Sequence, residues 1–221
     1  MTAFPNSPRI LKGGLVLIDP VTSAVRRIIV LQYNPDSLSR TLQVKGVGAQ
    51  EGDRSEALRL KGAPVETIKV EAEIDATDQL ELPDQGRNRV ATQFGISPFL
   101  AALETIIYPT SAQLQSNNSL AQAGTLEIAP MESPLTLFVW SKTRIMPVRI
   151  TELSITEEAF DTSLNPTRAK VSLGLRVLSV DDLGFNHKGG NLFMTYLRQK
   201  EQLAAMIQGG ALGAFGLTGI P

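Results

Sequence analysis

Hydrophobic and polar side chains alternate most regularly along residues 65–76, VETIKVEAEIDA. The apolar positions are Ile68, Val70, Ala72, Ile74 and Ala76, and the polar positions are Thr67, Lys69, Glu71, Glu73 and Asp75. A period of two predicts a strand that buries one face and leaves the other in water. At about 3.3 Å per residue the segment would extend over roughly 40 Å, which is longer than a usual strand.

Further strands are predicted on both sides of this segment. Residues 9–34 predict a β-hairpin, since two apolar runs, ILKGGLVLI and VRRIIVLQY, enclose the turn-forming DPVTSA. Apolar runs and alternation also predict strands at 134–141, 146–160 and 171–177. In the middle one of these, the apolar phase changes between Ile150 and Leu153, so we expect a β-bulge near Thr151–Glu152.

Two segments predict helices. The first, SPFLAALETIIYP, has Ser97 and Pro98 at its start and Pro109 at its end, which are common helix start and stop signals. The second, GGNLFMTYLRQKEQLAAMIQGG, carries an apolar stripe, and we expect Asn191 to cap it and Gly209 to end it.

Three segments predict no regular structure. Residues 46–64 combine glycine with charge and predict a long exposed loop, and the polar residues 110–124 predict another. The last 13 residues, GGALGAFGLTGIP, hold five glycines and no charge. Such a tail either docks on a neighbouring subunit, folds back on its own domain, or stays loose.

The predicted elements together indicate a mainly β fold with an inserted helix, an α+β sandwich or barrel. A chain of 221 residues buries roughly 70% of its unfolded surface, so its core is sizeable. We expect a β domain over residues 1–180, followed by a C-terminal helix and an apolar Gly-rich tail over residues 181–221.

Composition excludes several classes of function. The chain has 21 Lys and Arg against 22 Asp and Glu, a net charge of −1, and no dense basic stretch, so we expect no nucleic-acid partner. It has no cysteine, which excludes disulfides, zinc–thiolate sites and cysteine nucleophiles. We find no secretory signal and no apolar run long enough for a spanning helix, so we expect no direct membrane span.

Candidate chemistry is sparse, and we expect neither a cofactor, nor a metal, nor enzymatic activity. The single histidine, His187, lies in GFNHKGG and is interpreted as a solvated linker residue. Glu71 and Glu73 share a strand face at about 7 Å, a separation that glycosidases use for paired carboxylates. Two acids next to Lys69 and Asp75 are more typical of a solvated face.

Three segments, in this order, carry a resemblance to a known family: VLQYNPDSLSRTL, TIKVEAEIDATD and LFVWSKTRIMPVRITELSITEEAFDTSLNPTRAKVSLGLRVL. Over about residues 10–180 the chain resembles the N-terminal domain of contractile injection system tube proteins. These baseplate proteins begin the inner tube of phage-tail-like particles. Many members continue into a LysM domain, whereas this chain continues into a helix and a Gly-rich tail, so no LysM function is carried over.

The resemblance implies a structural role as tube initiator and adaptor. The chain would form a hexameric ring with itself between the trimeric spike hub and the inner-tube protein, in contact with other baseplate proteins. Its sheet would extend between subunits into a continuous barrel around a channel. Assembly would take place in the cytoplasm, within a particle that is either released or anchored to a membrane.

The resemblance also assigns candidate residues. The candidates for the subunit interface are Asp161, Asn165, Pro166, Arg168, Lys170 and Phe215. Arg168 and Lys170 would enter their strand near a subunit boundary and pair with acids across it, such as Glu157 or Asp161. The candidates for the channel lining are Lys69, Glu71, Glu73 and Asp75, which together are net acidic.

Other interpretations stay open at this point. The chain could be the repeating inner-tube subunit, a carboxylate-based hydrolase of cell wall or glycan, or a monomeric β-sandwich binding module. Asn165 and Pro166 also fit an ordinary hairpin turn, and the polar side of residues 65–76 also fits an outer solvated face.

Overall fold

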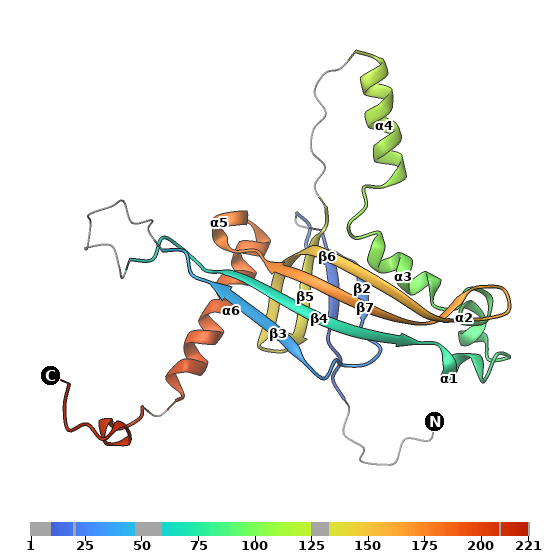
Figure 1. Cartoon of the computed structure of the whole chain (residues 1–221). Helices are drawn as coiled ribbons and strands as arrows, with labels where there is room; N and C mark the ends of the chain where they lie inside the picture. The colour runs from blue at the N-terminus through green and yellow to red at the C-terminus, as the bar shows by residue number, and fades with distance from the viewer. Residues whose placement is uncertain (1–9, 20, 47–58, 125–132, 208, 221) are drawn as a thin grey trace.

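The computed structural model describes residues 10–19, 21–46, 59–124, 133–207 and 209–220 (Figure 1). Its strands are β1 (Gly14–Ile18), β2 (Val25–Val30), β3 (Leu38–Gln43), β4 (Val65–Asp75), β5 (Leu135–Ser141), β6 (Arg144–Phe160) and β7 (Pro166–Val177). Its helices are α1 (Thr77–Leu80), η2 (Gly86–Asn88), α2 (Arg89–Phe94), α3 (Ser97–Glu104), α4 (Ser111–Gln122), α5 (Val180–Leu183), α6 (Lys188–Ala205) and η3 (Leu212–Phe215).

The described strands form one antiparallel sheet in the order β2-β1-β5-β6-β7-β4-β3. The fold is therefore α+β and mainly β, as the sequence predicts. The edge strands β2 and β3 do not pair with each other, so the sheet is open and does not close into a barrel. In Figure 1 the long strands β4, β6 and β7 pass in front of β1 and β2, which gives the sheet two layers.

The core lies between these two layers. Ile68 and Val70 of β4 pair with Leu175 and Leu173 of β7, and all four side chains are buried in the main hydrophobic cluster. The opposite layer contributes residues such as Phe138, also buried. Helices α3 and α6 complete the same cluster, through Leu100 and Leu103 of α3 and Phe193 and Tyr196 of α6.

Several local predictions are confirmed. Residues 14–30 form the predicted hairpin β1–β2, and β4 buries the predicted apolar positions of the segment 65–76. Helix α3 forms in the predicted segment, although Ile96 is at its N-cap in place of Ser97 and it ends at Glu104, before Pro109. The register of β6 shifts between Ile150 and Glu152, where the change of apolar phase predicts a bulge. The predicted loop at 46–64 lies mostly outside the described residues.

The predicted loop at residues 110–124 is wrong, because most of it forms helix α4. The Thr110 side chain accepts a hydrogen bond from the backbone N–H of Gln113, and the Gln113 side chain accepts one from the backbone N–H of Thr110. This capping box starts a helix in a segment with several Ala, Leu and Gln residues, which favour helix. No α4 residue is buried, and in Figure 1 the helix projects from the sheet.

Two further predictions need correction. His187, interpreted as a linker residue, caps α6, because its Nδ1 accepts a hydrogen bond from the backbone N–H of Gly189 at 3.1 Å. Asn191 therefore lies inside the helix and is not its cap. Strand β3 was not predicted at all, since SRTLQ has little apolar alternation and pairs as an edge strand.

Two glycines allow α6 to approach its neighbours closely. A Cβ on Gly189 would lie 2.4 Å from Leu183 and 3.2 Å from Leu135, and one on Gly190 would lie 1.9 Å from the carbonyl oxygen of Gly184. The contact of Gly190 is with backbone, which has little room to move. The start of α6 therefore requires glycine for its packing on α5 and β5.

Gly190→Ala is expected to lower the free energy of unfolding by about 2 kcal/mol, because the added methyl group overpacks a backbone contact. Gly210→Ala is the matched control, since a Cβ at Gly210 meets nothing within 4 Å. Urea denaturation of both variants and the wild type measures the difference. Equal midpoints for the two variants would contradict the close approach of α6.

Candidate functional site: a charged face of the sheet

The pairing of β4 with β7 brings the two sets of predicted residues together. Asp75 lies opposite Arg168, Glu73 opposite Lys170, and Glu71 opposite Ser172. These side chains share the side of the sheet that faces away from the core. We call them, with Lys69 of β4 and Glu158 of β6, the polar face.

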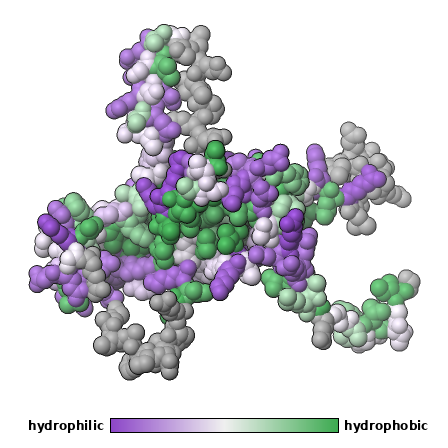
Figure 2. Space-filling model, turned by 180° about the vertical axis from the view of Figure 1, so that it is seen from behind, coloured by the Kyte–Doolittle hydropathy of each residue, from purple (hydrophilic) through white to green (hydrophobic). Residues whose placement is uncertain are grey.

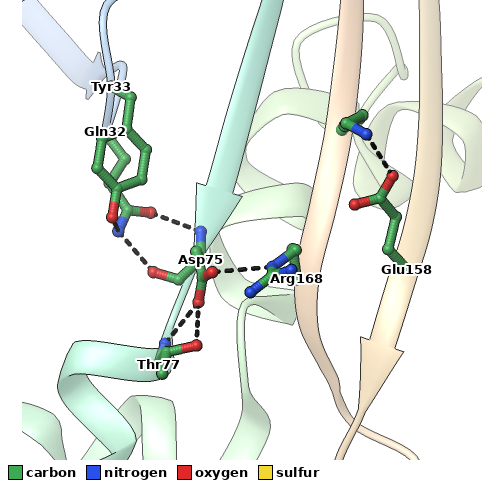
Figure 3. A network of polar contacts seen from close by, with 7 residues as sticks. Gln32, Tyr33, Asp75, Thr77, Glu158 and Arg168 are labelled. Atoms are coloured by element: carbon green, nitrogen blue, oxygen red, sulfur yellow. Dashed lines mark hydrogen bonds and ion pairs between the residues drawn. The ribbon is translucent and has the colours of Figure 1, made fainter.

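Asp75 is the centre of a hydrogen-bond network at one end of the polar face (Figure 3). Its carboxylate accepts hydrogen bonds from the side chain and the backbone N–H of Thr77, the latter at 2.7 Å. It also pairs with the guanidinium Nε of Arg168 at 2.9 Å. The hydroxyl and N–H of Thr77, together with Arg168, outweigh the effect of burial and lower the pKa of Asp75.

The backbone of Asp75 anchors the link between β2 and β3. The Gln32 amide nitrogen donates to the Asp75 carbonyl at 2.5 Å, and the Gln32 amide oxygen accepts from the Asp75 N–H at 2.9 Å (Figure 3). The Gln32 side chain therefore pairs with the backbone of β4 through both the nitrogen and the oxygen of its amide group. It ties the end of β4 to the link that joins the two edge strands, β2 and β3. The link is fixed in place over the end of the polar face.

Lys170 forms the second ion pair of the polar face, with Glu158 at 2.8 Å. A hydrogen bond from Lys170 to Glu158 and the charge of that carboxylate raise the pKa of Lys170. Glu158 is the unpaired residue at the place where the register of β6 shifts between Glu157 and Ala159. Glu157 itself lies opposite Ala169, which is buried on the other side of the sheet.

Arg168 and Lys170 therefore find carboxylates within their own chain, at Asp75 and Glu158. Pairing of these cations with acids of a neighbouring subunit stays a prediction. Their positive charges also make the net charge of this face less negative than the charge expected from β4 alone. The polar face holds four acids and three bases, a balance of 3 − 4 = −1, so it is almost neutral.

A hollow of about 700 Å³ lies over the polar face. Glu71, Glu73 and Lys170 line its floor, and the link residues Tyr33–Ser37 line its wall. Of the four residues predicted to line a channel, Glu71 and Glu73 border the hollow, Asp75 and Lys69 are not part of its lining, and Lys69 is exposed. All four residues lie on the side of β4 that faces away from the core, which is the side that residues of a channel wall would occupy.

Asn165 lies in the turn between β6 and β7, and Pro166 is the first residue of β7. Asp161 holds this turn, because its Oδ1 accepts from the backbone N–H of Ser163 at 2.7 Å and of Asn165 at 2.8 Å. These hydrogen bonds, together with one from the Asn165 side-chain amide, lower the pKa of Asp161. Leu164 adopts a φ of 64°, a left-handed turn conformation.

The turn also docks on α2 and α3 of the same chain. The carbonyl of Pro166 accepts from the Ile96 N–H at 2.8 Å, and the Asn165 amide donates to the Gln93 carbonyl at 3.3 Å. Gly95, at φ 57°, lies so close that a Cβ would meet the Pro166 oxygen at 2.1 Å. Pro166 is buried by these contacts, so its place in the sequence has an explanation within one subunit.

Sequence analysis missed a buried ionic cluster around Glu66. Glu66 is 3% exposed and accepts hydrogen bonds from Arg40 of β3 and from Tyr196 and Lys200 of α6, all between 2.8 and 2.9 Å. Burial opposes ionisation, but these three donors outweigh it and lower the pKa of Glu66. The only sequence signal was a glutamate in phase with the apolar positions of β4.

Comparison of the sequence with models of known protein families gave no match, and comparison with curated proteins gave none either. Within the described ranges, no group of three or more His, Asp or Glu side chains is placed to hold a metal ion. None of the helices among the described residues is both long and apolar enough to cross a membrane.

Glu66→Ala is expected to lower the free energy of unfolding by about 2 kcal/mol, because three donors lose a buried acceptor while Arg40 and Lys200 keep partial access to water. Glu71→Ala, on the solvated side of the same strand, is the control and should change stability by less than about 0.5 kcal/mol. Chemical denaturation measures both, and equal effects would contradict the anchoring role of Glu66.

The low pKa of Glu66 also predicts a pH dependence. The unfolded chain binds the proton near the ordinary value of 4.5, while the folded chain releases it down to lower pH. The resulting stabilisation is fully present above that value and is lost as pH falls through the folded pKa. From pH 6 to pH 3 the wild type should therefore lose more stability than Glu66→Gln, measured by urea denaturation at each pH. Identical losses would contradict the assignment.

Proposed function

We propose that this protein is a structural ring component of a contractile injection particle, initiating the inner tube and adapting the spike hub to it. The observation that carries the proposal is one open sheet whose central strands β4, β6 and β7 are long, whose end strands β2 and β3 have no further strand partner among the described residues, and whose charged face holds two internal ion pairs. The sequence resemblance over residues 10–180 supplies the family context.

The two free edges support assembly with other copies of the chain. β2 and β3 end the sheet on opposite sides, and each presents unpaired backbone groups along one flank. Pairing of β2 of one copy with β3 of the next would be a head-to-tail contact, which generates a ring when the rotation closes. We propose a hexameric ring, in which the sheets join into one barrel.

The polar face would then line the channel. Its ion pairs, Asp75 with Arg168 and Lys170 with Glu158, keep the wall wet while leaving little net charge to hold a passing cargo. The hollow over Glu71 and Glu73 would open toward the channel. On this proposal the function of these residues is mechanical and electrostatic.

The segments outside the sheet distinguish an initiator from a repeating tube subunit. Helix α4 projects from the sheet, and the end of α6 with the tail extends from it as well (Figure 1). Such extensions suit a terminal ring that contacts the spike hub, the first tube ring and other baseplate proteins. We propose that the ring assembles in the cytoplasm and stays within the particle.

The copy number per particle tests the proposal. We expect a tagged chain, expressed at its native level, to purify with sheath, tube and spike proteins on sheathed rods visible by negative-stain electron microscopy. Quantitative mass spectrometry should give about six copies per rod.

Two other outcomes are informative. Hundreds of copies per rod would identify the repeating tube subunit instead. A lone monomer without sheath or spike proteins would overturn the particle assignment and favour the hydrolase or the β-sandwich binding module.

A further inference from the structure

The side of the sheet opposite the core is apolar over β2, β1 and β5. The register places Val30, Gly14 and Val139 in one row, Ile28, Val16 and Leu137 in the next, and Val25, Ile18 and Leu135 in the third. Leu183 of α5 and Leu192 of α6 cover the β5 side of these rows, and Ile18, Leu135 and Leu137 are buried there.

The β2 side of the same rows has no such cover among the described residues. Val25, Ile28 and Val30 are 57%, 62% and 48% exposed. Figure 2 shows the apolar area in the centre of this side of the molecule. We call these three residues, with Val16 next to them, the outer patch. An exposed apolar area on a sheet face next to a free edge is typical of an interaction site.

The C-terminal residues 203–207 and 209–220 form an arm that is likewise apolar. No charged residue occurs from 202 to 221. Its exposed apolar side chains are Leu203, Met206, Ile207, Leu212, Phe215, Leu217 and Ile220. Phe215 is 77% exposed, and the arm extends away from the sheet in both Figure 1 and Figure 2.

The arm starts near the end of the sheet opposite the outer patch. The ionic cluster of Glu66, Arg40 and Lys200 fixes α6 to β4 and β3, the last two strands at one end of the sheet. The outer patch lies on β2, the strand at the other end. In a head-to-tail ring, the β3 side of one copy faces the β2 side of the next, so the arm of one copy points toward the outer patch of its neighbour.

We infer that the arm of each copy covers the outer patch of the adjacent copy. The inference rests on the proposed ring. Two observations select this occupant: both surfaces are apolar and uncharged, and the patch continues a face that α5 and α6 already cover within the chain. The arm of the neighbour would complete that cover and bury Phe215 and Ile28 together.

The absence of native cysteine gives a clean test by disulfide cross-linking of full-length chains. A tagged Phe215→Cys chain and an untagged Ile28→Cys chain are mixed, allowed to assemble, and oxidised with copper phenanthroline. We expect a mixed disulfide between the two chains at least ten times more abundant than in the control mixture. The control replaces Ile28→Cys with Ser154→Cys, an exposed position of β6 that lines the hollow over the polar face.

Electron microscopy of the same mixtures separates this inference from the proposed function. Rings that form without the Phe215–Ile28 disulfide would overturn the inference and leave the ring intact. The absence of both rings and cross-link would overturn both. A chain that carries both substitutions and forms the disulfide only within itself, as a monomer, would show that the arm covers its own patch and would also overturn the inference.

Discussion

The antiparallel register between β4 and β7 is the constraint on which the rest of the structure depends. It sets Ile68 against Leu175 and Val70 against Leu173 in the core, and Asp75 against Arg168 and Glu73 against Lys170 in water. A slip of one residue would exchange the two sides and bury the charges. The core and the candidate channel wall are therefore two consequences of one pairing.

Among the described residues, Glu66 is the one acid that is buried on the apolar side, and it is buried where α6 is fixed to the sheet. Its carboxylate is buried on the apolar side of β4, and its donors come from both β3 and α6. A buried charge is tolerated only when it is paired and hydrogen-bonded. The cluster thus couples the direction of the C-terminal helix, and hence of the arm, to one edge of the sheet.

A subunit that leaves both sheet edges open keeps surfaces that a monomer would blunt or cover. β2 is an edge strand with exposed Ile28 and Val30, and proteins usually blunt or cover such an edge. Head-to-tail pairing would hydrogen-bond the two edges, and the arm of the adjacent copy would cover the apolar side chains. The ion pairs of the polar face would stay in contact with water in the assembled ring.

The sequence by itself determined the elements whose signals are local: the alternating strand β4, the hairpin β1–β2, the helix α3, and the bulge after Ile150. It also showed which polar residues share one side of β4. The partners were decided only by the tertiary structure. Arg168 meets Asp75, which is far away in the chain, and Lys170 pairs with Glu158 of the neighbouring strand.

The errors have the same origin. His187 caps α6, and the unpredicted cluster at Glu66 depends on donors from β3 and α6, so both depend on how closely separate elements approach. Helix α4 is an error of another kind, because its signal is local. The capping residues Thr110 and Gln113 stand in the sequence, but the polar composition of residues 110–124 predicted a loop. Periodicity reports which side of an element is buried, because burial repeats along the chain. It does not report which other element covers that side, because that contact is made across the fold.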